Sequence, residues 1–272
     1  MRLQGRRILV VGASSGLGRA AAAAAAAEGA RVAFAARRLD RLEEAAAEAG
    51  GDCIAVRCDV RDEVSCDAAV AQAADSLGGI DAIVYAPGIS TFCPIENIDA
   101  SMWRAVLETN LVGASLIARA AIPHLEASDA DVGGKAVFLS SIVIDDSPPR
   151  PEQATYVVSK VALETLIRAW QGEHRRVGFT TIAIGDSLSE FAVGQDISEV
   201  GRIVQNWSEQ GYMYGRIMAA ESVAAQVVNA LASPETVRRI AITPHYPRAE
   251  DGEGGDETWE SQLASASESD ES

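Results

Sequence analysis

The sequence contains little lysine, histidine or cysteine. Of its 23 basic residues only two are lysine, Lys135 and Lys160, and it has three histidines and four cysteines. The cysteines form no C-x-x-C pair, and with the scattered histidines they offer no metal-ligand spacing. We therefore expect no metal site, and small buried thiols in a reducing compartment. The cysteines are Cys53, Cys58, Cys66 and Cys93.

A long apolar run is also missing. No segment approaches the ~18 consecutive apolar residues that span a bilayer. Basic residues near the start precede an apolar stretch, but glycines interrupt it after residues 8–11, which is too short for the core of a signal peptide. The sequence therefore predicts a cytoplasmic protein with no membrane partner.

The net charge of -16 over 272 residues argues against a nucleic-acid partner, because so acidic a surface repels phosphate unless a basic patch is segregated. No such patch is present. Residues 248–272 hold nine acidic residues and one arginine, a net of -8, and the other 247 residues also sum to -8. Gly, Ser and acidic residues dominate this terminus, which cannot bury enough apolar area to offset its ordering entropy. We expect residues 248–272 to be a disordered acidic tail.

Short apolar runs alternate with helix-like stretches of ten or more residues up to about residue 247. This alternation predicts crossovers and a parallel sheet covered on both faces. No change of composition divides residues 1–247, so we predict one α/β domain, a single doubly wound parallel sheet of the Rossmann type. The expected strands are 7–11, 31–36, 53–57, 82–85, 135–139, 179–184 and 239–243. The expected helices include 39–49, 64–77, 101–127, 153–170 and 220–231, and residues 187–218 are less regular.

Three glycines follow the first expected strand, with the spacing G-x-x-x-G-x-G. Glycine allows a tight turn and a close approach to a pyrophosphate, whose charge a helix N-terminus stabilises. Any turn from strand to helix can use glycine, so the position at the first crossover of a βαβ unit is what favours a dinucleotide. The loop residues expected to bind it are Gly12, Ser14, Ser15, Gly16, Leu17 and Gly18.

Tyr156 and Lys160 form a Y-x-x-x-K pair at the start of an expected helix. Their spacing places both on one helical face. A phenol with a pKa near ~10 is a poor acid–base catalyst at neutral pH, and a neighbouring ammonium lowers that pKa, as proton transfer to a carbonyl oxygen requires. The pair alone is common, but lysine is scarce here. In addition, Ser140 and Ser141 end the preceding strand, on the ligand-bearing edge of such a sheet.

Together these motifs resemble the short-chain dehydrogenase/reductase family, in its classical branch, over residues 5 to 245. The resemblance implies an NAD(P)-dependent oxidoreductase that interconverts a ketone or aldehyde and an alcohol by hydride transfer. It implies that Tyr156 moves the proton, that Lys160 lowers the pKa of the phenol and holds the nicotinamide ribose, and that Ser141 positions the substrate oxygen. Asn110, in LETNLVGA, matches the helical asparagine of the family, which orders a water that links Lys160 to solvent.

The end of the second strand bears on the choice of cofactor. A carboxylate there would bind the ribose 2′-hydroxyl of NAD, but this strand is followed by Arg37 and Arg38, with no acid until Asp40. Arg37 can bind a phosphate with its fork of donors and stack on adenine. A solvated surface arginine is the alternative. The missing acid and the resemblance both favour NADP over NAD.

The resemblance also assigns cofactor contacts further along the chain. Asp59 and Val60 match the pair that contacts adenine, and Ser189 keeps the hydroxyl of the threonine that touches the nicotinamide carboxamide. The fourth strand departs from the family, since Tyr85 begins a Tyr-Ala-Pro-Gly segment where Asn-Asn-Ala-Gly is usual, so the support of the sheet must differ. The complete set of these later contacts is Asp59, Val60, Gly88, Gly185 and Ser189.

Residues 188–218 occupy the place where the fold usually covers its substrate. This segment is rich in large apolar side chains, which predicts a hydrophobic small-molecule carbonyl or alcohol as substrate, although some of them can simply pack the lid onto the body. Acidic residues at 145 and 146 could meet a polar substrate group or be solvated. The large side chains are Phe191, Trp207, Tyr212, Met213 and Tyr214.

Helices 101–127 and 153–170 resemble those through which the family forms dimers and tetramers, so a homodimer or homotetramer is expected. Two other functions remain open. One is a redox sensor or scaffold that binds a dinucleotide without turnover, and the other is an interaction protein that acts through its acidic tail. The joint presence of Asn110, Ser141, Tyr156 and Lys160 argues against the first.

Overall fold

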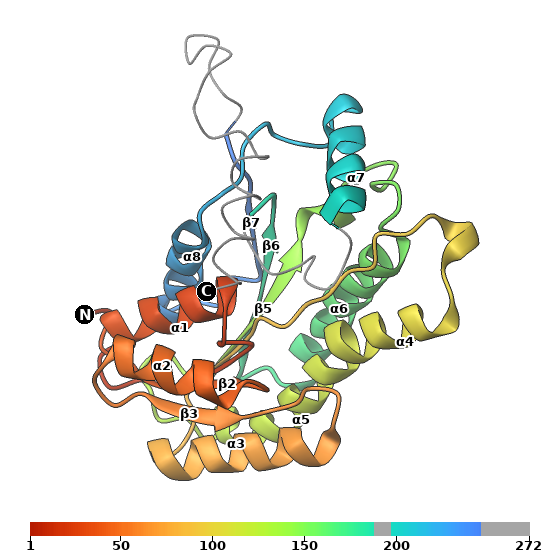
Figure 1. The fold of residues 1–272 in the computed structure, drawn as a ribbon. Coiled ribbons are helices and arrows are strands. Elements are labelled where there is room, and N and C mark those ends of the chain that lie inside the picture. The colour runs from red at the N-terminus through yellow and green to blue at the C-terminus, as the bar shows by residue number, and fades with distance from the viewer. Residues whose placement is uncertain (188–196, 246–272) are drawn as a thin grey trace.

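The computed structural model describes residues 1–187 and 197–245, and the expected acidic tail and Ser189 lie outside these ranges. Seven parallel strands form one sheet in the order β3-β2-β1-β4-β5-β6-β7, with helices on both faces (Figure 1). The predicted fold class, a doubly wound parallel sheet, is confirmed. The strands are β1 (Arg7–Val11), β2 (Arg31–Ala36), β3 (Ile54–Arg57), β4 (Ala82–Tyr85), β5 (Lys135–Ser141), β6 (Gly178–Ile184) and β7 (Arg239–Ile242).

The helices agree with the expected ones in most places and differ in two. The α-helices are α1 (Gly16–Ala27), α2 (Leu39–Ala49), α3 (Glu63–Leu77), α4 (Ala100–Leu107), α5 (Gly113–Glu126), α6 (Ala154–Glu173), α7 (Ile197–Glu209) and α8 (Ala220–Ala232). Short helical turns are η1 (Ile95–Asn97) and η3 (Ile142–Ile144), both 3-10, and η2 (Glu108–Val112), which is π-helical.

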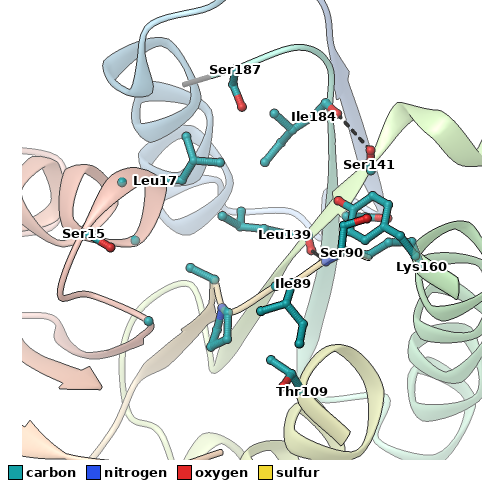
Figure 2. A pocket seen from close by; sticks show the side chains of 18 of the residues that line it. Ser15, Leu17, Ile89, Ser90, Thr109, Leu139, Ser141, Lys160, Ile184 and Ser187 are labelled. Carbon is teal, nitrogen blue, oxygen red and sulfur yellow. Dashed lines mark hydrogen bonds between the residues drawn. The ribbon is translucent and has the colours of Figure 1, made fainter. Parts of the chain in front are cut away.

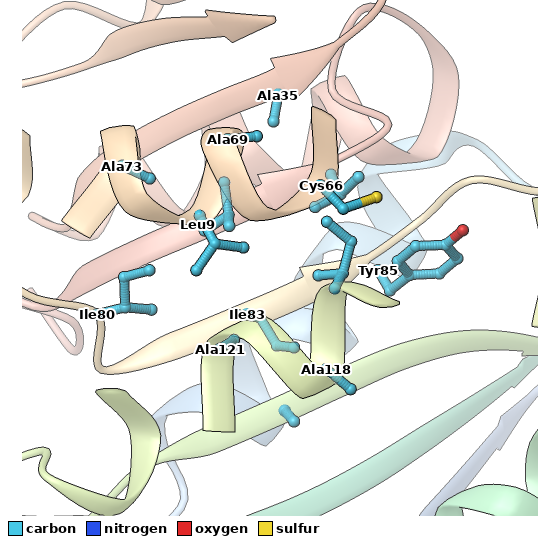
Figure 3. Close-up of a cluster of buried hydrophobic side chains, with 14 of the residues drawn as sticks. Leu9, Ala35, Cys66, Ala69, Ala73, Ile80, Ile83, Tyr85, Ala118 and Ala121 are labelled. Atoms are coloured by element: carbon cyan, nitrogen blue, oxygen red, sulfur yellow. The ribbon is translucent and has the colours of Figure 1, made fainter. Parts of the chain in front are cut away.

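The alternation of side chains along each strand divides the core into two clusters. In β1, Leu9 packs on the side of α3, α5 and α6, whereas Val10 packs on the side of α1, α2 and α8. Figure 3 shows the first cluster, where small residues on α3 and α5 such as Ala69 and Ala118 let those helices approach the strands closely. Because both faces are covered, the strands are apolar throughout.

The single helix expected over residues 101–127 is wrong in detail. The structure has α4, the π-helical turn η2 and α5 in succession. The π-helical turn carries Thr109 and Asn110, both buried. π-Helical turns are rare and are frequent at functional sites, and the apolar pattern of the sequence gives no sign of this one.

The segment expected to be irregular, residues 187–218, contains the helix α7. Val200, Ile203 and Trp207 recur at intervals of three and four residues and are buried, so the helical period that predicts α7 is present in the sequence. In Figure 1 this helix stands beyond the carboxyl ends of the strands, near β5 and β6.

Residues Ala100–Glu126, taken together, form the one stretch among the described residues that is long and apolar enough to cross a membrane, with a mean hydropathy of 1.4. In the fold, 44% of the most apolar 18-residue part of this stretch is buried, and α5 packs on the strands and on α3. This is the burial expected of a helix that covers one face of a sheet.

Candidate active site

A cavity of about 620 Å³ extends along the carboxyl ends of the strands. Crevices at this edge are where open parallel sheets bind ligands, at the point where the strand order reverses, which here lies between β1 and β4. The glycine loop before α1 lines one part of the cavity, and Ser141 and Lys160 line another (Figure 2). The structure thus brings the two predicted groups of site residues into one cavity.

The glycine loop is tightly packed against the start of α1. Gly12 has a φ of 83°, and a Cβ at Gly18 would lie only 2.2 Å from the carbonyl oxygen of Gly12. Side chains at either position would separate the helix from the strand. Ser15 precedes α1 without a side-chain cap, and the first turn holds no acidic residue. The N–H groups and the positive dipole end at the N-terminus of α1 are therefore suited to bind the pyrophosphate of a dinucleotide.

The two arginines after β2 have different environments. Arg38 donates hydrogen bonds from Nη2 to the hydroxyls of Ser14 and Ser15, at 3.1 and 3.0 Å. Arg37, the residue chosen from the sequence, is exposed and also lines the cavity. Sequence reasoning missed Arg38, because adjacent arginines look equivalent until the turn into α2 directs one of them over the glycine loop.

Asp59 and Val60, predicted to contact adenine, line the cavity beyond β3. The side chain of Asp59 accepts a hydrogen bond from the N–H of Arg61 at 3.0 Å, and its own N–H donates to Ser65 Oγ at 2.9 Å. These bonds fix the turn between β3 and α3, so that Val60 presents an apolar surface beside a polar one.

Tyr85 provides the support that the missing asparagines leave open. Its hydroxyl donates to the carbonyl oxygen of Thr109 at 2.6 Å and joins the end of β4 to η2. A Cβ at Gly113 would lie 2.7 Å from the same hydroxyl. The phenol therefore fits only because residue 113 has no side chain.

Asn110 is fully buried and makes three side-chain hydrogen bonds. Its Oδ1 accepts from the N–H of Ile89 and its Nδ2 donates to the carbonyl of Ile89, both at 2.9 Å. Nδ2 also donates to Ser159 Oγ at 2.9 Å. Asn110 thereby holds the loop after β4 against α6. A Cβ at Gly88 would lie 3.5 Å from Lys160 Nζ and 3.9 Å from Asn110 Oδ1, so Gly88 lies beside both.

Tyr156, Ser141 and Lys160 come together around the inner part of the cavity. The hydroxyl of Ser141 acts on the phenol of Tyr156 and lowers its pKa, in opposition to burial. Lys160 Nζ donates to the carbonyl of Leu139 at 2.8 Å and lies 5.6 Å from the centre of the Tyr156 ring. Ser141 Oγ also donates to the carbonyl of Ile184 at 3.4 Å (Figure 2).

Burial controls the protonation of this group. It raises the pKa of Tyr156 to about 12, against the opposing effects of the Ser141 hydrogen bond and the Arg150 charge. Burial also lowers the pKa of Lys160 to about 8, against the opposing effect of Glu164. The sequence predicted a phenol with a lowered pKa. The shift has the opposite sign in this structure because desolvation of the phenolate outweighs the effects of Ser141 and of the Arg150 charge.

The remaining predicted contacts lie near the end of β6. Gly185 lines the cavity, and its N–H donates to the carbonyl of Ile242 at 2.8 Å. Ser187 forms a bridge with Met218, which joins the start of the 187–218 segment to its end. Ser140, the neighbour of Ser141 in β5, also lines the cavity, and its buried hydroxyl has no hydrogen-bond partner.

A second polar group, missed by sequence reasoning, lies at the cavity wall. Arg150 donates from Nε to Asp146 at 3.0 Å and from Nη1 to Asp186 at 2.8 Å. It also lies 5.6 Å from the ring centre of Trp207 on α7. Asp146 is therefore ion-paired, as is Asp145, which pairs with Arg239. Neither acid is simply solvated.

No group of three or more His, Cys, Asp or Glu side chains that could hold a metal ion occurs in residues 1–187 and 197–245. All four cysteines are free. Burial raises the pKa of Cys53 and Cys93.

Comparison with known proteins agrees with this geometry. The family model described as short chain dehydrogenase matches residues 6–196. The chain belongs to the short-chain dehydrogenase/reductase family. It is therefore placed among oxidoreductases that bind a nicotinamide dinucleotide.

Individual relatives extend over most of the chain. An 11-beta-hydroxysteroid dehydrogenase 1A from Arabidopsis thaliana is 32% identical over 84% of this chain, and this chain spans 66% of the length of that relative. The solved structure of a short-chain type dehydrogenase/reductase from Mycobacterium marinum is 27% identical, with a TM-score of 0.77. The match covers 89% of this chain and 95% of that one. The solved structure of an alcohol dehydrogenase from Thermococcus sibiricus, complexed with 5-hydroxy-NADP, is 25% identical, with a TM-score of 0.74. The match covers 89% of this chain and 98% of that one.

Proposed function

We propose that this member of the family uses NADP to interconvert a hydrophobic ketone or aldehyde and the corresponding alcohol. The observation that carries the proposal is the meeting of Tyr156, Ser141 and Lys160 in one cavity with the glycine loop. The bound cofactor would supply or accept a hydride, and the protein would supply orientation and a proton.

In the direction of reduction, Tyr156 gives its proton to the carbonyl oxygen. A pKa of about 12 keeps the phenol protonated at neutral pH, so it is ready to act as the acid. Ser141 binds the same oxygen and orients the carbonyl. Lys160 stabilises the phenolate that remains and holds the ribose of the cofactor, and Asn110 positions the backbone beside Lys160.

NADP is favoured by the cations beside the glycine loop. Arg38 holds the hydroxyls of Ser14 and Ser15, and Arg37 lines the same part of the cavity. Guanidinium groups bind phosphate through paired donors. We assign the 2′-phosphate to this pair, with Arg38 as the contact that the geometry favours. The T. sibiricus neighbour, complexed with 5-hydroxy-NADP, supports the same choice.

An apolar substrate is favoured by the side chains that α7 and the loop after it contribute to the cavity. They line the cavity with carbon surface, and burying apolar substrate area there stabilises the complex. The side chains are Val200, Val204, Trp207, Met213 and Ile217.

Further expectations follow for the whole chain. We propose that residues 1–247 form the catalytic unit and that 248–272 act as an acidic tail, so deletion of 249–272 should leave turnover unchanged. The proposal includes a homodimer or homotetramer in the cytoplasm. Exposed apolar side chains at Val112, Val158 and Val161, on η2 and α6, support self-association, and light scattering of the purified protein tests it.

The test of the activity is direct. Purified protein is mixed with NADPH and a panel of aliphatic, cyclic and aromatic ketones, and the loss of absorbance of the reduced cofactor is followed. Turnover that Tyr156→Phe reduces at least a thousandfold, with NADPH binding retained, would support the proposal. If the protein reduces no carbonyl with NADPH and oxidises no alcohol with NADP, a dinucleotide-binding sensor or scaffold is favoured instead.

A further inference from the structure

The turn before α6 is held in a conformation that a side chain rarely adopts. Glu152 has a φ of 63°, the one positive φ outside glycine in the part of the chain that the structure describes. Strained backbone of this kind persists only when its surroundings fix it, and it is frequent at ligand sites. Here the N–H of Cys93 donates to the Glu152 carbonyl at 2.9 Å, and Arg202 on α7 donates to its carboxylate at 2.8 Å.

On one side of this turn lies Arg150, which lines the cavity and is 5% exposed. Nε and Nη1 are paired with Asp146 and Asp186, but Nη2 is buried and has no hydrogen-bond partner. A buried donor without a partner lowers stability and calls for an explanation.

On the other side lies Gln153, which lines the same cavity and is 3% exposed. Its Oε1 is buried and also without a partner. Gln153 immediately precedes the first turn of α6, and its carbonyl accepts a hydrogen bond from the N–H of Val157 at 3.0 Å. Arg150 and Gln153, which flank the strained residue closely in sequence, therefore contribute an unpaired donor and an unpaired acceptor, and both residues line the cavity that Tyr156 also lines.

We propose that Arg150 and Gln153 bind a second, neutral oxygen of the substrate, a hydroxyl group near the carbonyl that is reduced. The hydroxyl accepts a hydrogen bond from Nη2 of Arg150 and donates one to Oε1 of Gln153. Both atoms are covered by neighbouring side chains, so the substrate reaches them through a change of side-chain rotamer. The inference rests on the proposed function and narrows its substrates to hydroxy ketones and the diols that they form.

Local charge favours a hydroxyl over a carboxylate or phosphate. Arg150 is flanked by Asp146 and Asp186, so the group of three carries a net charge of -1 and disfavours an anion. A hydroxyl brings no charge and can both donate and accept. The redox chemistry is unchanged, since the hydride comes from NADPH and the proton from Tyr156.

The test compares ketones that carry a hydroxyl on the α, β or γ carbon with ketones that lack only that hydroxyl. We expect the kcat/KM of wild-type protein with NADPH to be at least tenfold higher for the hydroxy member of at least one pair, because a site built to hydrogen-bond a hydroxyl rejects the analogue without it. Gln153→Leu, which keeps the volume and removes the amide, should lower that ratio about tenfold. Gln205→Leu, on the exposed face of α7, is the matched control and should keep the wild-type ratio.

The outcomes separate the two proposals. The inference is overturned if both members of every pair are turned over equally, or if Gln153→Leu leaves the ratio of kcat/KM values unchanged. In either case, reduction of the plain ketones would still support the proposed function. Absence of turnover with every ketone overturns the proposed function and the inference together. Thermal unfolding and NADPH binding of Gln153→Leu exclude a folding defect as the cause of a lower ratio.

Discussion

The hydroxyl of Tyr85 donates a 2.6 Å hydrogen bond to the backbone carbonyl of Thr109, and through it the end of β4 holds the π-helical turn that carries Asn110. Both groups are buried. Burial raises the pKa of Tyr85, with further contributions from Cys66 and Cys58, so the phenol stays a donor over the accessible pH range. One side chain thereby connects the sheet to the helix that places a candidate catalytic residue.

The first prediction concerns this bond. Tyr85→Phe leaves the Thr109 carbonyl buried without its partner, at an expected cost of about 1–3 kcal/mol in the free energy of unfolding. Chemical denaturation followed by circular dichroism measures it. Tyr212→Phe, in the loop after α7, is the control, and equal stabilities of the two variants would contradict the role of the Tyr85 bond.

The second prediction distinguishes the two arginines beside the glycine loop. Arg38→Ala should weaken NADPH binding about 10–100-fold and leave NADH binding nearly unchanged, since charge-assisted bonds to a phosphate are lost only with the phosphorylated cofactor. Fluorescence titration of both cofactors measures this. Arg37→Ala, exposed on the same turn, should have the smaller effect. A larger effect at Arg37 would restore the assignment made from the sequence.

The sequence was sufficient for the fold because each signal was local. The alternation of short apolar runs with helix-like stretches predicted the parallel sheet, and all seven expected strands are present. The π-helical turn could not be predicted, because it depends on the packing of Tyr85 against Gly113 across a large sequence separation. The helix α7 was predictable in principle, because Val200, Ile203 and Trp207 recur at helical spacing and are buried.

Scarcity of lysine was a weaker argument than it looked. Both lysines are 3% exposed, but Lys135 donates to the carbonyl of Glu235 at 2.9 Å and does not line the cavity. Only the position of Lys160 beside Tyr156 distinguishes the two. The sequence gives no sign of Arg150 and Gln153 as site residues, because no short motif contains them. Only the fold shows that they line the same cavity as Tyr156.

The third prediction concerns Ser141. Ser141→Ala removes the hydroxyl that we propose binds the substrate oxygen, so kcat for ketone reduction should fall about 10²–10³-fold. The pKa of Tyr156 should rise further, because the Ser141 hydrogen bond opposes the effect of burial. Single-turnover kinetics with NADPH measure the chemical step. Ser140→Ala, at the neighbouring position, is the control and should retain most of the activity.

The fourth prediction concerns the pH dependence of reduction. In the proposed mechanism Lys160 stabilises the phenolate only while charged, and burial lowers the pKa of Lys160 to about 8. Reduction should therefore be nearly constant from pH 6 to about 8 and fall at higher pH as Lys160 loses its proton. The kcat/KM profile for one ketone measures it. A rate that stays constant well above pH 8 would show that bound cofactor raises this pKa or that Lys160 has no electrostatic role.

The fifth prediction relates the same lysine to stability. A folded-state pKa lowered from the ordinary value for lysine means that the charged form is disfavoured in the fold. The penalty is complete below about pH 8 and disappears as the pH rises toward the unfolded pKa. Lys160→Met should therefore abolish turnover and, at pH 7, raise the free energy of unfolding by about 1–3 kcal/mol, after the loss of the bond to Leu139 is subtracted. The gain should shrink at pH 10, and a variant less stable than wild type at both pH values would show that the ammonium contributes more through its hydrogen bond than it loses by burial.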